Sequence, residues 1–331
     1  MASWNIAVVG ANGQVGSALV ELLENSDLTI EHLDLIGSDN SEGEIVRFAG
    51  KNLTIKHIDQ MNWSNCHLVF FAANQETSEK YARLAAQSGC VVIDATGIFA
   101  LDESIPLVLP KVNESRLEDY RNENIVSVAN PMVSQALRSM AALTDIEQLS
   151  QLHITNLVPA SYYGKKGVNS LAGQSARLLN GLPAENDFFD KQLAFNVLPS
   201  SLTGDEQIVE QIRRITGNYQ LAISVDSMLV PVFYGLTQAI SFVSSVPHSI
   251  AKDDTLLSQY GVTLVSDDYP TPVTVINNEQ PEEQIIMVAN FHYSYGNQEQ
   301  IQFMSVSDNI RYLGARVLLE TAESLLIHYI D

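Results

Sequence analysis

Cysteine is scarce in this chain of 331 residues, which has only two, Cys66 and Cys90. Two cysteines cannot form a disulfide framework, so a small disulfide-stapled scaffold is excluded and a reducing, cytoplasmic location is expected. Each cysteine precedes a run of apolar residues. We therefore expect both to be small buried side chains and not catalytic thiols.

Basic residues are scarce as well: 18 Lys and Arg face 39 Asp and Glu, for a formal charge of −21. Such a charge repels phosphate groups, so nucleic acid and anionic membrane surfaces are not expected partners, and solubility is its simplest role. The N-terminal residues lack the pattern of a signal peptide, and no apolar run reaches the ~20 residues that span a bilayer. No two histidines stand at metal-ligand spacing, so no metal site is expected.

The first part of the chain alternates apolar runs with helical patterns. The length suggests two domains, and the 46% hydrophobic fraction is that of a globular protein. Strands are expected at residues 5–10, 32–37, 67–73, 90–94, 108–112 and 125–128, helices at 16–25 and 78–88, and a hairpin arm at 47–57. This alternation predicts an α/β, Rossmann-type doubly wound parallel sheet.

The second part has a different pattern, with long β-rich runs. Strands are expected at residues 153–160, 224–232, 237–243 and 285–292, and a strong helix at 309–329. Runs of strands separated by few helices predict an α+β domain with a mixed or antiparallel sheet. The boundary between the two parts is expected near Asn130.

A glycine-rich loop lies between the first expected strand and the first expected helix. In the G-x-x-G-x-x-G pattern the first glycine allows a tight turn, the second lets a pyrophosphate approach the backbone, and the third lets the helix pack on the strand. The expected dinucleotide contacts are Gly10, Asn12, Gly13, Gln14, Val15 and Gly16. The alternative is that these glycines only shape the turn.

The segment after the second strand bears on the choice of dinucleotide. It contains Ser38 and Asp39, with Glu42 and Glu44 following and no cation before Arg47. A carboxylate here holds a ribose diol, whereas a 2′-phosphate needs a basic residue. If a cofactor binds, NAD is therefore favoured over NADP; the alternative is an ordinary solvated loop.

Several segments together resemble the aspartate-semialdehyde dehydrogenase family. They are the glycine loop and residues 105–113 (IPLVLPKVN), 129–131 (ANP), 194–199 (AFNVLP), 230–235 (VPVFYG) and 306–309 (VSDN). The resemblance implies a Rossmann dinucleotide domain at residues 1–129 plus a C-terminal helix at 309–331. It also implies an α+β catalytic-like and dimerisation domain at 130–308, a homodimer, and Asn309 among the cofactor contacts.

The family reaction uses NADPH, a cysteine nucleophile and a histidine acid and base. The matching positions depart from that pattern. Val133 stands in place of the nucleophile and Leu236 in place of the histidine. Leu229 and Ala100 stand in place of two arginines that bind the substrate, and Ala160 in place of a glutamine. Gln211 lies near an expected glutamate, and Asp39 replaces the cation for the 2′-phosphate. The resemblance is greatest to the Usg-type members, which keep the fold and lack these groups.

We therefore expect a non-catalytic dimer that acts by interaction or sensing, with an unknown cytoplasmic protein or a small molecule as partner. The alternatives are an NAD(P)-dependent oxidoreductase with an altered substrate and a purely structural partner of another enzyme. Ser134 replaces the nucleophile only if a base lies beside it. Other candidates are better explained by packing or by an exposed loop, namely His153, Lys165, Lys166 and the aromatic residues Tyr162, Tyr163, Phe233 and Tyr234.

Overall fold

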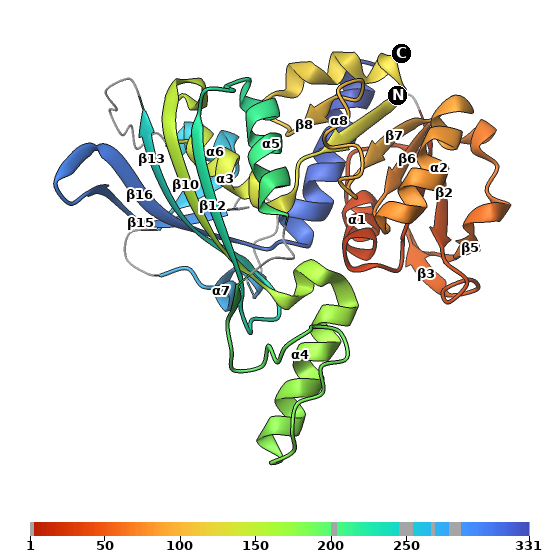
Figure 1. Cartoon of the computed structure of the whole chain (residues 1–331). Coiled ribbons are helices and arrows are strands. Elements are labelled where there is room, and N and C mark those ends of the chain that lie inside the picture. The colour runs from red at the N-terminus through yellow and green to blue at the C-terminus, as the bar shows by residue number, and fades with distance from the viewer. Residues whose placement is uncertain (1–2, 200–203, 245–253, 266–268, 278–285, 331) are drawn as a thin grey trace. The chain divides into compact units, whose positions relative to one another are not determined.

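The computed structural model describes residues 3–199, 204–244, 254–265, 269–277 and 286–330. The chain forms two compact units, the first comprising residues 1–130 and 314–331 and the second residues 131–313 (Figure 1).

The first unit contains a seven-stranded sheet in the order β5-β2-β1-β6-β7-β9-β8, and every pairing within it is parallel. Its strands are β1 (Trp4–Val9), β2 (Ile30–Gly37), β5 (Lys56–His57), β6 (Leu68–Phe71), β7 (Val91–Asp94), β8 (Leu107–Val108) and β9 (Ile125–Val128). The helices of this unit are α1 (Gln14–Glu24), α2 (Gln75–Gln87) and α8 (Val317–His328). The predicted Rossmann-type sheet is confirmed.

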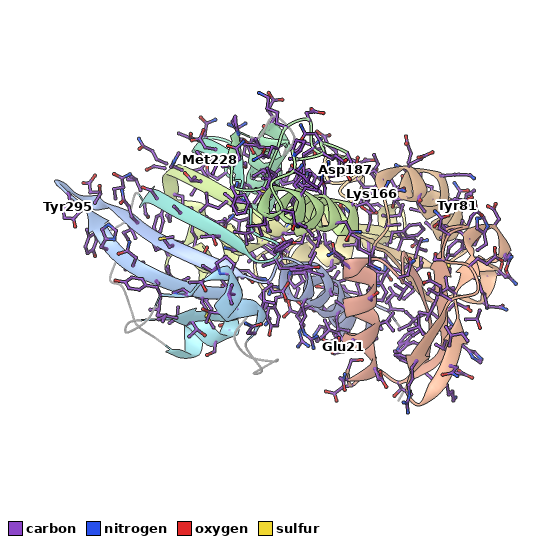
Figure 2. The ribbon with its side chains drawn as sticks, turned by 90° about the horizontal axis from the view of Figure 1, so that it is seen from below. Glu21, Tyr81, Lys166, Asp187, Met228 and Tyr295 are labelled. Atoms are coloured by element: carbon purple, nitrogen blue, oxygen red, sulfur yellow. The ribbon has the colours of Figure 1, made fainter. Side chains whose placement is uncertain are left out.

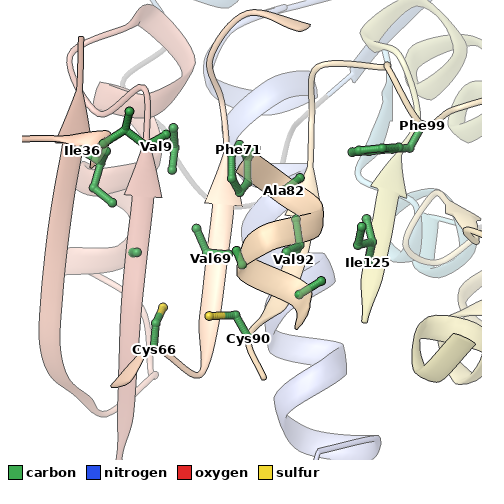
Figure 3. Packing of buried hydrophobic residues seen from close by; sticks show 14 of the residues in the cluster. Val9, Ile36, Cys66, Val69, Phe71, Ala82, Cys90, Val92, Phe99 and Ile125 are labelled. Atoms are coloured by element: carbon green, nitrogen blue, oxygen red, sulfur yellow. The ribbon is translucent and has the colours of Figure 1, made fainter. Parts of the chain in front are cut away.

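The central strands of this sheet are continuous apolar runs because they are covered on both faces. All four residues of β6 are buried, and so are those of β7 and β9. Figure 3 shows side chains of Val69, Phe71, Val92 and Ile125 packed with Ala82 of α2. This core holds the ends of the strands, and the loops that follow them, in a constant position.

Three local predictions for the first unit need correction. The expected hairpin arm at 47–57 is the β3 (Ile45–Phe48) and β4 (Lys51–Thr54) hairpin, after which β5 joins the parallel sheet beside β2. The expected strand at 108–112 ends at Val108; the chain then turns, with Lys111 at a φ of 70° and the N–H groups of Val112 and Asn113 donating to the Leu109 carbonyl oxygen. The last helix has a π-helical segment at Arg311–Arg316, and α8 begins only at Val317.

The second unit contains a seven-stranded sheet in the order β11-β12-β10-β13-β16-β15-β14. Its strands are β10 (Leu149–Val158), β11 (Leu198–Pro199), β12 (Ala222–Leu229), β13 (Leu236–Ser244), β14 (Val262–Leu264), β15 (Ile286–Ser294) and β16 (Asn297–Ser307). The β10–β12 and β14–β15 pairs are parallel and the other pairs antiparallel. The predicted mixed sheet is confirmed, although Ile285 of one expected strand lies outside the described residues.

Helices α3 (Pro131–Ala141) and α5 (Asp205–Thr216) pack on one face of this sheet (Figure 1). The remaining helices of the unit are α4 (Gly164–Leu179), α6 (Asp254–Gln259) and α7 (Pro272–Ile276). Strand β16 was not predicted, because its polar residues obscure the apolar alternation. It forms a hairpin with β15, at whose tip Tyr295 is 97% exposed (Figure 2).

Candidate functional site

The glycine loop follows β1 and leads into α1. Gly10 has a φ of +85°, and a Cβ there would lie 2.5 Å from the carbonyl oxygen of Ala72. A Cβ on Gly16 would lie 2.1 Å from the carbonyl oxygen of Gly10. These two positions therefore need glycine for the packing of the turn itself, whether or not a ligand binds.

The N-terminus of α1 is free of side-chain caps. Gly13 is the N-cap residue and makes no side-chain cap hydrogen bond, and the first turn contains no acidic residue. The first N–H groups of a helix have no acceptor within the helix, and the helix dipole adds a partial positive charge. Gln14 and Val15 lie in this turn, and Asn12 lies in the loop just before Gly13. The residues present thus fit a pyrophosphate, which would accept hydrogen bonds from these N–H groups.

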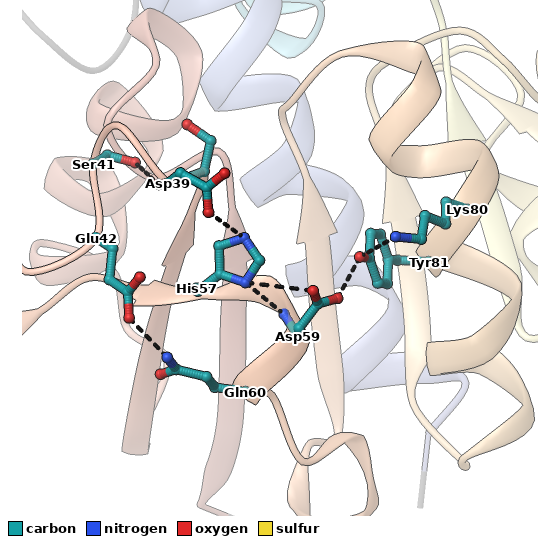
Figure 4. A network of polar contacts seen from close by, with 9 residues as sticks. Asp39, Ser41, Glu42, His57, Asp59, Gln60, Lys80 and Tyr81 are labelled. Carbon is teal, nitrogen blue, oxygen red and sulfur yellow. Dashed lines mark hydrogen bonds and ion pairs between the residues drawn. The ribbon is translucent and has the colours of Figure 1, made fainter.

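The segment after β2 forms a tight turn. The carbonyl oxygen of Ser38 accepts hydrogen bonds from the backbone N–H groups of Ser41 and Glu42, at 2.9 and 3.1 Å. Asp39 follows Ser38, and its side chain is 89% exposed. Its carboxylate Oδ1 lies 3.0 Å from Nε2 of His57 (Figure 4). We did not predict His57 as a site residue.

Four of the positions at which this sequence departs from the family pattern lie close together at one edge of the second sheet. Leu229 ends β12 beside Val158, and Leu236 begins β13. Ala160 follows β10, and its backbone N–H donates to the carbonyl oxygen of Val232 at 2.8 Å. The start of α3, which carries Val133, reaches the same edge, as two side-chain contacts to it show. These are Gln238 Nε2 to the Met132 carbonyl oxygen at 2.8 Å and Gln135 Nε2 to the Leu236 carbonyl oxygen at 3.4 Å.

These positions are apolar and buried. Val133, Leu236 and Ala160 are completely buried, and Leu229 is 2% exposed. Ser134 is completely buried and Gln211 is 3% exposed. Ala100, the fifth position, is 1% exposed in the first unit. The side chains of Val, Leu and Ala at these five replaced positions cannot act as a nucleophile, exchange a proton or bind an anion by charge.

Asn309 lies at the same edge of the second unit. Its Oδ1 accepts hydrogen bonds from the Ser161 hydroxyl and from the Gly235 backbone N–H, both at 3.1 Å. The residue is 3% exposed. Its side chain thus ties the segment after β10 to the start of β13.

An uncharged polar row crosses the sheet beneath α3. Ser305, Gln238, Asn156 and Ser227 are register partners on four neighbouring strands. Gln238 Nε2 donates to Asn156 Oδ1 at 2.7 Å, and Asn156 Nδ2 donates to Ser227 Oγ at 3.0 Å. The Ser227 hydroxyl in turn donates to the carboxylate of Asp205 at 2.5 Å. The row joins the strands to α5 by hydrogen bonds and does not form a general-base pair.

Both cysteines are buried, as predicted, and their sulfurs face each other (Figure 3). Hydrogen bonding with Cys90 and burial raise the pKa of the Cys66 thiol. The Cys90 thiol lies 3.1 Å from the carbonyl oxygen of Trp63. The hydrogen bond with Cys66 lowers the pKa of the Cys90 thiol. Both sulfurs are buried against backbone carbonyl oxygens, which agrees with a packing role.

The remaining sequence candidates are dispersed over the second unit. His153 lies on β10, its side chain 46% exposed, with Nε2 3.9 Å from Asp226 Oδ2. Lys165 and Lys166 are exposed in the first turn of α4. Tyr163 makes an edge contact with Phe189 at 5.7 Å between ring centroids.

Among the described residues, no three His, Cys, Asp or Glu side chains form a group that suits a metal ion. No helix in the described part of the chain is long and apolar enough to cross a membrane.

Two family models match the chain in order. Residues 5–120 match the semialdehyde dehydrogenase NAD binding domain, and residues 140–312 match the semialdehyde dehydrogenase dimerisation domain. The aspartate-semialdehyde dehydrogenase of Shewanella violacea is 34% identical over 98% of both chains. A USG-1 protein homolog of Azotobacter vinelandii is 33% identical over 97% of both chains.

A solved structure, aspartate semialdehyde dehydrogenase II from Vibrio cholerae, superposes with a TM-score of 0.93 at 31% identity. The match covers 99% of this chain and 100% of that structure. The chain therefore belongs to the semialdehyde dehydrogenase family, with an NAD(P)-binding-type first domain and a dimerisation-type second domain.

Proposed function

We propose that this chain is a non-catalytic homodimer that binds NAD in preference to NADP and acts by interaction or ligand sensing. The observation that supports the loss of the family reaction is the edge of the second sheet. There Val133, Leu236, Leu229 and Ala160 pack as buried apolar side chains. The family reaction needs a nucleophilic thiol and a group that exchanges protons in its active site. These four side chains supply neither.

Retention of dinucleotide binding is supported by the uncapped N-terminus of α1, together with the match to the NAD binding domain model. When bound, a nicotinamide dinucleotide supplies a hydride donor or acceptor. In a non-catalytic protein its role is instead that of a ligand which stabilises the folded first domain by its own binding free energy.

An activity assay tests the loss of reaction. The chain is incubated with aspartate semialdehyde, inorganic phosphate and either NAD or NADP, and the absorbance of the reduced nicotinamide is followed. The Vibrio cholerae relative, named as an aspartate semialdehyde dehydrogenase, is the positive control. We expect turnover at least about 10⁴-fold below the control, since removal of a nucleophile costs on the order of 5 kcal/mol or more. Turnover within tenfold of the control would contradict the proposal.

The second candidate function is an oxidoreductase that acts on another substrate with NAD. The glycine loop and the match to the NAD binding domain model favour it over an unrelated activity. Ser134→Ala separates the two functions: any NAD-dependent aldehyde oxidation by the chain must fall with this substitution if Ser134 is the nucleophile. If neither the original chain nor the Ser134→Ala variant oxidises aldehydes, the result supports the non-catalytic function.

The outward face of the second sheet supports the homodimer. Helices α3 and α5 pack on the other face, so the outward face is exposed along β10, β12, β13 and β16. It presents Gln151, His153, Thr155, Leu157, Ala222, Ser224, Asp226, Met228, Ala239, Ser241, Gln300, Gln302 and Met304. Asp226 is the one carboxylate in this set, on a chain of charge −21. A second copy can approach this face with little charge repulsion, and the match to the dimerisation domain model covers it.

A further inference from the structure

The network around His57 joins the turn after β2 to the next helical segment. His57 ends β5, where its register partner is Gly37 at the end of β2. It is also the N-cap residue of the short 3₁₀ helix Ile58–Gln60. The imidazole is therefore held between the end of β2 and the start of this helix. Its side chain is 22% exposed.

The hydrogen bonds around the ring assign its tautomer. The backbone N–H of Asp59 donates to Nδ1 of His57 at 3.3 Å, so Nδ1 is the acceptor. The proton of the neutral ring is then on Nε2. Nε2 lies 3.0 Å from Oδ1 of Asp39 (Figure 4). His57 therefore accepts at the helix cap through Nδ1 and contacts the carboxylate of Asp39 through Nε2.

Asp39 depends on this contact for a defined orientation. Its side chain is 89% exposed, and an exposed carboxylate samples several rotamers. The contact with His57 Nε2 is made through one carboxylate oxygen, Oδ1. Asp39 is also the residue at which a Rossmann fold recognises the adenosine ribose.

The surrounding charges oppose a phosphate at this point. Glu42 is held in the same turn by a 2.7 Å hydrogen bond from Gln60 Nε2. The hydrogen bond from the Tyr81 hydroxyl, at 2.5 Å, lowers the pKa of Asp59 and so keeps it ionised. Lys80 donates to the same hydroxyl at 2.6 Å and is the cation of this network. Asp39, Glu42 and Asp59 thus place three carboxylates in this network, and Asp39 and Asp59 lie against the imidazole of His57.

We propose that His57 is a positioning residue that orients Asp39 to accept the ribose hydroxyls of NAD and thereby disfavours a dinucleotide with a 2′-phosphate. The inference rests on the dinucleotide binding proposed above and adds the residue that determines which dinucleotide is preferred. His57 itself does not contact the dinucleotide in this arrangement. Its effect is transmitted through the carboxylate of Asp39.

Two substitutions at position 57 separate the contact with Asp39 from the helix cap. His57→Asn retains an acceptor for the Asp59 N–H and loses the donor to Asp39, whereas His57→Gln places an amide N–H near the position of Nε2. We expect His57→Asn to weaken NAD binding about tenfold, because Asp39 loses the 3.0 Å contact that orients its carboxylate. We expect His57→Gln to bind NAD within about threefold of the original protein.

Calorimetric titration of NAD and of NADP into each full-length protein measures both affinities, and thermal unfolding without ligand measures folding. We expect a smaller NAD over NADP preference in His57→Asn and an unchanged unfolding temperature. We also expect the His57→Asn, Asp39→Asn double variant to bind NAD no more weakly than Asp39→Asn alone. Unaltered affinities in His57→Asn would overturn the role of His57 and leave dinucleotide binding intact. Failure of the original protein to bind either dinucleotide would overturn both proposals, and equal binding of the two would overturn the stated preference.

Discussion

The glycines of this chain differ in what a side chain would meet. A Cβ on Gly16 would lie 2.1 Å from the carbonyl oxygen of Gly10, a backbone atom that cannot move away independently. A Cβ on Gly173, in α4, would meet open space, and this residue has a helical position where alanine is favoured. We expect Gly16→Ala to reduce the free energy of unfolding by about 3 kcal/mol and Gly173→Ala to raise it by up to about 1 kcal/mol.

Urea denaturation of the two variants and the original protein checks this pair. A Gly16→Ala protein as stable as the original would show that the loop relaxes without cost. In that case the glycine would have to be explained by ligand binding and not by packing.

Asp94 makes the stability of the first unit depend on pH. It is fully buried at the end of β7, and burial raises its pKa to about 6, although Ser78, Thr96 and Gly97 donate hydrogen bonds to it. The unfolded chain has the ordinary value of 3.8. Because the folded state holds the proton more tightly, this contribution to stability is complete below pH 3.8 and is lost as the pH rises through 6.

Asp94→Asn tests that dependence. The two pKa values give a total change of about 3 kcal/mol, of which about 1.4 kcal/mol falls between pH 5 and pH 8. We expect the free energy of unfolding of the original protein, measured in urea, to decrease by this amount relative to the variant over that interval. Parallel pH profiles for the two proteins would contradict the raised pKa.

Prediction from sequence succeeded where a local pattern determines the element and failed where the answer depends on a distant pairing. The glycine spacing and the apolar run of β1 are local, so the loop and its strand could be predicted. His57 could not be paired with Asp39, because their contact exists only once β5 joins the sheet beside β2. The burial of Val133 and Leu236 likewise depends on the packing of α3 against β13.

At the scale of elements, the polar row beneath α3 shows why the strands of the second sheet were harder to delimit. Asn156 and Gln238 are completely buried, yet their side chains interrupt the apolar pattern on which strand prediction depends. Both amide N–H groups donate hydrogen bonds, that of Asn156 to Ser227 on β12 and that of Gln238 to Asn156 and to the Met132 carbonyl oxygen of α3, while Gln238 Oε1 is buried without a partner. Burial of such groups is tolerable only with those partners in place.

Gln238→Met measures what the row contributes. Methionine has a similar length but no donor, so the Met132 carbonyl oxygen and Asn156 Oδ1 would each lose the hydrogen bond that Gln238 Nε2 supplies. We expect the free energy of unfolding to fall by about 2–4 kcal/mol. Gln87→Met, the same substitution at an exposed position of α2, is the control and should change it by less than about 0.5 kcal/mol. Equal effects of the two substitutions in urea denaturation would show that the row adds no stability.

At the scale of the whole molecule, charge limits which surfaces can associate. A net charge of −21 gives long-range repulsion between copies, so a stable dimer requires a face with few carboxylates. The outward face of β10, β12, β13 and β16 meets this condition. Its central strand presents Ala239, an exposed residue whose small side chain allows a second sheet to approach closely.

Ala239→Glu places a carboxylate at the middle of that face. In a two-fold symmetric dimer the substitution occurs once in each copy, so two buried like charges oppose association. We expect the dimer to dissociate at least tenfold more readily, measured as a shift toward monomer mass in size-exclusion chromatography with light scattering at micromolar protein. Gln87→Glu adds the same charge to α2 in the first unit and should leave the mass unchanged. A dimer that survives Ala239→Glu with its affinity intact would place the interface on another surface of the chain.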